Sequence, residues 1–325
     1  HGLGVVEREL EVRGDQVGQP AGVLEVGDQH QHLGRNPLAE RHDLVHRLLR
    51  GAHQRLRLER GLGNRRLEDA LDPRLQEAEI ARVRERPTDS FGAYDCVLRG
   101  LAVLYNFNMP DFALAGDMFR RAIELDAHYA QAHAHLAWWH NLRFGEGMSS
   151  DLRLDQRLAD EHSQAAVQID PRDAWSLSVA GHIQSFLDKR FDVALEMFDQ
   201  ALRLNPSCAT AWARSANTLA YIGRGEEAME RVRNAMRLSP FDQLSFAYCT
   251  TNGTAAFVTG RLDEAVSWLN KAQRLNPRYK ASKRMLIAAL ALAGEADRAR
   301  HHALEFMAWE PGFTLSAFAQ WYPLQ

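Results

Sequence analysis

The stretch ATAWARSANTLAYIGRGEEAMERVRNAMRLSP, residues 209–240, decides the fold of this chain. It carries a glycine near its middle, Gly223, and a proline at its end, Pro240. Glycine ends a helix readily because it tolerates the left-handed backbone conformation, and proline disfavours helical geometry in the residue before it. The stretch therefore predicts two helices that are separated by a turn and followed by a stop.

The same punctuation recurs along the chain. A mark made of an apolar residue, a small polar or acidic residue and then proline or alanine ends at Ala127, Pro171, Pro206, Pro240, Pro277 and Pro311. The steps between these marks are 44, 35, 34, 37 and 34 residues. A period near 34 is typical of a helix–turn–helix repeat. The long first step indicates an inserted loop, which we expect between Phe144 and Asp151.

The second half of each unit has a face of small residues twelve, eight and five places before its mark. In the unit that ends at Pro240 these positions hold Ala228, Val232 and Ala235. Spacings of four and three place them on one face of a helix, where alanine lets a partner helix approach closely. The unit that ends at Pro171 departs at the bulky position, Ser163, and the last unit has Phe306 where alanine is expected.

With this period and these positions, the chain resembles the tetratricopeptide repeats from about Ala93 to Pro311, in five or six units. The resemblance implies an all-α solenoid of stacked helix pairs. Residues 312–325 then form a capping segment, which could be truncated, with a helix around Leu315 to Trp321. Phe318, Trp321 and Tyr322 would supply its covering contacts, because an end repeat otherwise exposes an apolar face.

A narrower resemblance concerns residues 70–95 and the tail 311–315. These stretches look like the repeat region that ends bacterial class III adenylate/guanylate cyclase-like proteins and some winged-helix transcriptional regulators. This similarity implies a regulatory region for an output domain that is absent from the sequence, and reading the gene upstream would test it.

Residues 1–79 have a different composition, with no Ser, Thr, Lys, Ile, Met, Cys or aromatic residue except histidine. Such a stretch has little with which to fill a core, which predicts a segment of low order. Two interpretations remain open: a genuine linker, or a misread frame over residues 1 to about 66. Because the first residue is His1, we expect the chain to be a fragment or a processed product.

The bulk properties exclude several classes of function. The net charge of −3 does not favour a nucleic-acid or membrane surface, and no apolar run reaches the roughly 18 residues of a membrane span. The three cysteines form no CxxC pair, so neither a disulfide framework nor a zinc site is expected. We therefore expect a cytoplasmic location, and no nucleic acid bound by this region.

No catalytic, cofactor or metal motif stands out. The histidines His128, His133, His135 and His140 lack the spacing of a metal site, so we interpret them as ordinary helix surface. The adjacent pair Trp138-Trp139 is interpreted as packing, with one ring in the core and the other against a neighbouring unit. The chain itself is therefore expected to be a binding module rather than an enzyme.

The concave side of the solenoid is the candidate binding surface, because first helices line it in stacked helix pairs. The resemblance places five residues there: Ser178, His182, Ala213, Asn217 and Ala220. Some members of the family hold a partner's terminal carboxylate with paired Lys and Asn, but Ala213 stands where that Lys is needed. We expect a protein or peptide partner in this groove.

Overall fold

A computed structural model of the chain describes residues 92–323. Within this range the secondary structure is helical throughout, without a β-strand. None of its helices is both long and apolar enough to cross a bilayer. The predicted low-order segment 1–79, and most of the cyclase-like stretch at 70–95, lie outside the described residues.

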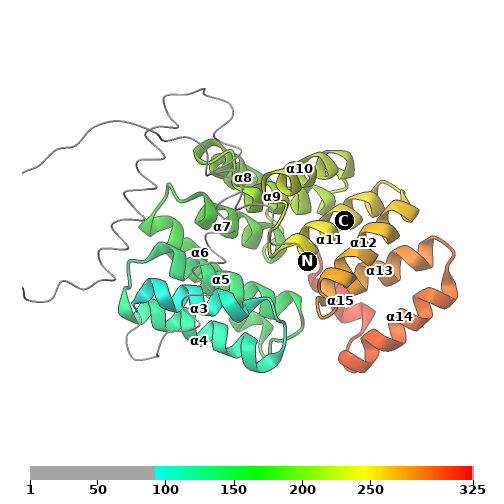
Figure 1. The fold of residues 1–325 in the computed structure, drawn as a ribbon, viewed down its shortest axis with the longest axis horizontal. Helices are drawn as coiled ribbons and strands as arrows, with labels where there is room; N and C mark the ends of the chain where they lie inside the picture. The colour runs from blue at the N-terminus through cyan, green and yellow to red at the C-terminus, as the bar shows by residue number, and fades with distance from the viewer. Residues whose placement is uncertain (1–91, 324–325) are drawn as a thin grey trace, which may run out of the picture. The chain divides into compact units, whose positions relative to one another are not determined.

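The helices succeed one another in chain order and are labelled α3 to α15 in Figure 1. Their bounds are α3 (Ala93–Leu104), α4 (Met109–Leu125), α5 (Ala130–Gly145), α6 (Leu152–Ile169), α7 (Ala174–Phe186), α8 (Phe191–Leu204), α9 (Ala209–Tyr221), α10 (Gly225–Leu238), α11 (Ser245–Val258), α12 (Leu262–Leu275), α13 (Lys280–Leu292), α14 (Ala296–Trp309) and α15 (Leu315–Trp321). The first twelve form six helix pairs, each packed on the next. The predicted all-α repeat solenoid is confirmed.

Side-chain caps fix the starts of several early helices. Asn108 accepts a hydrogen bond from the backbone N–H of Asp111 at the start of α4, at 3.0 Å. Asp151 and Asp173 cap α6 and α7 in the same way. A cap of this kind satisfies a backbone donor that has no partner inside the helix.

The face of small residues is the seam within each helix pair. In the second helices α4, α6, α8, α10 and α12, all three positions of the face are fully buried. They are Ala115, Phe119 and Ala122; Ala159, Ser163 and Ala166; Ala194, Phe198 and Ala201; Ala228, Val232 and Ala235; and Ala265, Leu269 and Ala272. The periodic pattern therefore located the contact between the two helices of each of these pairs.

The turns inside the later pairs share one backbone conformation. Gly223, Gly260 and Gly294 have φ angles of 76°, 76° and 80°, in the left-handed region that the sequence predicted for Gly223. Lys189 occupies the equivalent turn between α7 and α8 with φ 57°, although it carries a side chain. A non-glycine residue in this region is strained by roughly 1–2 kcal/mol.

The C-terminal segment packs on more than one unit. Phe313 contacts both Phe306 of α14 and Phe318 of α15, with ring centroids 5.0 and 5.6 Å apart. Trp321, at the end of α15, instead contacts Phe144 and Phe186 at 5.4 and 6.0 Å. Helix α15 therefore bridges the last helix pair and the ends of α5 and α7.

The inserted loop after α5 joins distant parts of the array. Glu146 in this loop is 2% exposed and accepts hydrogen bonds from the backbone N–H groups of Lys280 and Ala281, at 2.7 and 3.3 Å. Arg284 of α13 donates to the carbonyl oxygen of Gly145 at 2.7 Å. The departure from the repeat period thus provides a contact between the second and the sixth pair.

A second contact of this kind lies beside the first. Asn276 and Arg278, in the turn before α13, donate to the backbone carbonyls of Tyr105 and Asn106, just after α3. Tyr105 also packs edge-on against Phe246 of α11, with centroids 6.2 Å apart. The first pair is therefore tied to the fifth and sixth.

The left-handed turns predict opposite effects of two substitutions. Gly223→Ala places a methyl group where nothing lies within 4 Å, so only the backbone is perturbed. We expect it to lower the free energy of unfolding by about 1 kcal/mol, and Lys189→Gly to raise it by about 0.5 kcal/mol. Urea unfolding followed by circular dichroism measures both. A Lys189→Gly variant less stable than the parent would contradict this account of the turns.

Glu146 predicts a pH-dependent contribution to stability. Burial raises the pKa of its carboxyl to about 7, although Arg284, Lys280 and Ala281 act in the opposite direction. The folded chain therefore takes up a proton between the unfolded value of 4.5 and about pH 7. Stabilisation by this group is complete below that window and is lost as the pH rises through it. The free energy of unfolding of Glu146→Gln, measured relative to that of the parent, should therefore rise by about 1–3 kcal/mol between pH 5 and 7.5.

Comparing the variant with the parent at each pH cancels the contributions of the other titrating groups. Glu227→Gln is the matched control, because a hydrogen bond from Arg224 lowers the pKa of Glu227 and no histidine acts on this carboxylate. Its difference from the parent should stay constant from pH 5 to 7.5. If the difference in free energy of unfolding between Glu146→Gln and the parent were also independent of pH, the buried carboxyl would be ionised throughout this range.

Candidate binding site on the first helices

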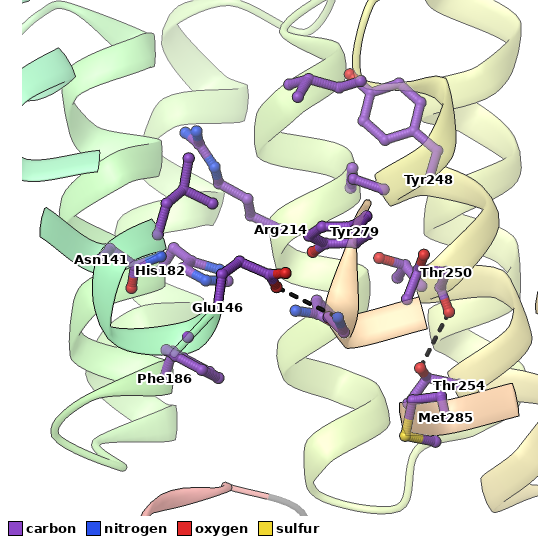
Figure 2. A pocket seen from close by; sticks show the side chains of 18 of the residues that line it. Asn141, Glu146, His182, Phe186, Arg214, Tyr248, Thr250, Thr254, Tyr279 and Met285 are labelled. Carbon is purple, nitrogen blue, oxygen red and sulfur yellow. Dashed lines mark hydrogen bonds between the residues drawn. The ribbon is translucent and has the colours of Figure 1, made fainter. Parts of the chain in front are cut away.

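The first helices of five consecutive pairs, α5, α7, α9, α11 and α13, line a hollow. It encloses about 850 Å³, part of which is open to solvent. Figure 2 shows Asn141, Glu146 and His182 on one wall, with Thr250 and Thr254 on the other. Tyr322, just after α15, also contributes to the lining.

The first helices bury polar as well as apolar residues, because they lie between the second helices and the hollow. In α7 every residue from Ser176 to Phe186 is buried, whereas α8 buries only the small-residue face. The buried polar side chains of α7 include Ser178, His182 and Gln184. Burial of polar groups is costly unless they find partners, and part of this layer is paired within the array: Ser178 donates to the carbonyl oxygen of Trp175, and Gln184 donates to Asp160 and Asp188.

Arg214 of α9 is the most unusual group of this surface. Its guanidinium carbon packs on the indole rings of Trp138 and Trp175, 4.3 Å from each ring centroid. Its Nη1 donates to Ser178 Oγ at 2.6 Å, while its Nη2 has no hydrogen-bond partner among residues 92–323. Burial lowers the pKa of Arg214 to about 10, which leaves it positively charged at neutral pH.

Two histidines flank the two indoles. His182 lies edge-on to Trp138 and His135 is tilted against Trp175, with centroids 5.2 and 5.0 Å apart. Burial, reinforced by the charge of Arg214, lowers the pKa of both imidazoles to about 3. The imidazoles are therefore neutral, and Arg214 is the positive charge of this cluster.

The structure separates the five residues that the resemblance placed in the groove. His182, Ala213 and Asn217 line the hollow. Ser178 lies behind them as the hydrogen-bond partner of Arg214, and Ala220 is fully buried in the core. Asn217 donates to Tyr221 Oη at 2.7 Å.

Several residues that line the hollow were not predicted from the sequence. Arg214 is adjacent to Ala213 and could have been found from that position, but its burial depends on Trp138 and Trp175 of two other pairs. Glu146 belongs to the insertion that the long step revealed, yet no periodicity relates it to Arg284.

The interpretation of the histidines as helix surface is wrong for two of them. His135 and His140 are 6% and 4% exposed. His135 lies between Phe119 of the first pair and Trp175 of the third, whereas His140 faces α6 within its own pair. His140 Nδ1 contacts Asp155 Oδ1 at 2.5 Å. Burial raises the pKa of Asp155, but hydrogen bonds from His140 and Ser149 and the charge of Arg143 together bring it below its usual value.

The interpretation of the tryptophan pair as packing residues holds for Trp139. This ring stacks on Phe112 at 5.7 Å and donates from Nε1 to the carbonyl oxygen of Phe112 at 2.7 Å. Trp138 packs against His182 of the neighbouring pair and Arg214 of the pair after it, and it also lines the hollow. In the described part of the chain, no group of three or more Cys, His, Asp and Glu side chains is arranged to hold a metal ion.

Comparison with known proteins gives a consistent result. No family model matches the chain. Small glutamine-rich tetratricopeptide repeat-containing protein 2 of Mycosarcoma maydis is 28% identical over 101 residues, which are 31% of this chain and 28% of the relative. The chain thus spans less than a third of this curated relative.

Solved structures show the same fold at low identity. The human IFIT1 dimer with m7Gppp-AAAA is 13% identical, with a TM-score of 0.56, over 67% of this chain and 50% of IFIT1. The human IFIT1 dimer with PPP-AAAA is 12% identical, with a TM-score of 0.57, over 72% and 54%. This chain covers about half of IFIT1, and the likeness concerns the fold alone. The repeat period, the buried small-residue face and the relative from Mycosarcoma maydis together show that the helical array is similar to tetratricopeptide-repeat proteins.

Proposed function

We propose that the array is a protein-interaction module whose first helices bind a segment of a partner protein. The observation that carries the proposal is the buried polar layer of these helices, which faces a hollow instead of a packed core. Around the hollow, half-buried side chains such as Thr210, Asn217 and Ala247 offer a rim that a peptide can contact. The chain acts by binding and carries out no reaction itself.

Two further features support this proposal. The three cysteines Cys96, Cys208 and Cys249 are free thiols, which fits a reducing compartment such as the cytoplasm. The lining combines aromatic rings with separate hydrogen-bonding groups, including Tyr248, Tyr279 and Thr250. Aromatic residues with a polar end are enriched where proteins bind one another.

Site-specific photo-crosslinking tests the proposal. A photoreactive residue at Asn217, on the rim, should capture one defined segment of a partner protein from native extract, and mass spectrometry should locate that segment. Glu230 is exposed on α10 and is the matched control position, where the same residue should not capture it.

The captured segment then gives a quantitative test. As a synthetic peptide it should bind the parent chain, and Asn217→Trp, which narrows the rim, should weaken binding at least tenfold, or about 1.4 kcal/mol. Glu230→Trp should leave the affinity unchanged. Because IFIT1 carries RNA in the structures above, a short 5′-triphosphate RNA is the competing probe. Capture of RNA alone at position 217, with no protein segment, would contradict the proposal.

A further inference from the structure

Arg214 has the properties of an anion-binding residue. It is 6% exposed, and its hydrogen bond goes to the neutral hydroxyl of Ser178 rather than to a carboxylate. Its guanidinium carbon lies 4.3 Å from the ring centroids of both Trp138 and Trp175, so the charge is packed against two indoles. Nη2 is buried and has no hydrogen-bond partner in the described residues. A buried charge is costly unless it is paired, and an oxygen in the plane of the guanidinium would pair it.

A second guanidinium lines the same hollow. Arg284 of α13 donates from Nη2 to Gly145, and its Nε has no hydrogen-bond partner within residues 92–323. Glu146 is the carboxylate of the lining and lies 3.9 Å from Arg284. Burial lowers the pKa of Arg214, and the charge of Asp242, which is not part of the lining, acts in the opposite direction. The Asp242 carboxylate accepts hydrogen bonds from Tyr248 Oη and from the backbone N–H of Leu244.

The charges of the lining select the ligand. Two guanidinium groups face one carboxyl group, which leaves one positive charge to be balanced when Glu146 is ionised. A monoanion balances it, whereas a phosphate dianion would add repulsion from Glu146. A carboxylate also matches the flat, edge-on donors that a guanidinium presents.

The remaining lining favours a flat apolar body next to that carboxylate. The rings of Phe186, Tyr221, Tyr279 and Tyr322 surround the hollow together with Trp138. His182 Nδ1 is buried and has no hydrogen-bond partner in the described range, so the site also has a neutral group for a second polar atom. Apolar walls with a few convergent polar groups are typical of small-molecule sites.

We propose that this hollow binds a small planar carboxylate, with its carboxyl group at the guanidinium of Arg214 and its apolar body among the aromatic rings. The site goes beyond the binding of a protein segment and does not depend on it. In a protein that binds both ligands, binding of the small anion would affect binding of the protein segment at the same surface. The alternative is that Arg214 only joins neighbouring pairs through its contacts with the two indoles.

Calorimetry and tryptophan fluorescence on the full chain separate these alternatives. Benzoate should bind and change the emission of the indoles around Arg214, at least tenfold more tightly than acetate or inorganic phosphate. Arg214→Gln should weaken benzoate binding at least tenfold. Arg231→Gln is the matched control, because Arg231 lies 5.9 Å from the ring of Trp212 but is absent from the lining. Equal benzoate affinity of the Arg214 variant and the parent, or preference for phosphate, would overturn the proposal.

A measurement on the unaltered chain decides the matter if Arg214→Gln does not fold. Crystals of the parent protein soaked in 4-bromobenzoate should show the anomalous signal of bromine inside the hollow, with carboxylate density at Arg214. Bromine signal only outside the hollow, or none, would overturn the proposal. Neither result bears on whether position 217 captures a protein segment, so failures of the two proposals are distinguishable.

Discussion

The structure depends on one constraint: each second helix has an apolar face that its own first helix covers, and each resulting pair must stack on a neighbour. Ala194, Phe198 and Ala201 show the arrangement within a pair, since the two alanines allow close approach and the ring fills the space between them. Because a helix pair cannot bury both of its faces alone, stacking continues along the chain. The first helices are consequently covered on several sides, which allows polar groups to be buried beside the hollow.

The sequence was sufficient to predict the repeated pairs, because their contacts are local and periodic. Ser163 shows why a residue that departs from the repeat pattern can still occupy the buried face. Its hydroxyl donates to the carbonyl oxygen of Asp160 within the same helix, at 3.0 Å, so the fully buried side chain needs no distant partner. By contrast, the contact of Glu146 with Ala281 joins residues 135 positions apart, and no repeat relates them.

The candidate site was predictable in part for the same reason. The positions of His182 and Asn217 follow from the repeat, and both line the hollow. Arg214 follows from no local rule, since a single charged residue in a helix usually faces water. Its burial requires Trp138, Trp175 and Ser178, which two other pairs contribute, so its environment is known only once these pairs are stacked.

The contacts from the loops after α3 and α5 to the turn before α13 change how the array can come apart. In an open row of repeats the terminal units fray, and each unit responds chiefly to its nearest neighbours. Here Asn276 is hydrogen-bonded to Tyr105, and the backbone N–H of Lys280 is hydrogen-bonded to Glu146. Neither end of the row can therefore separate without breaking hydrogen bonds to the other. Local opening of one unit is thereby converted into a cooperative event that involves both termini of the row.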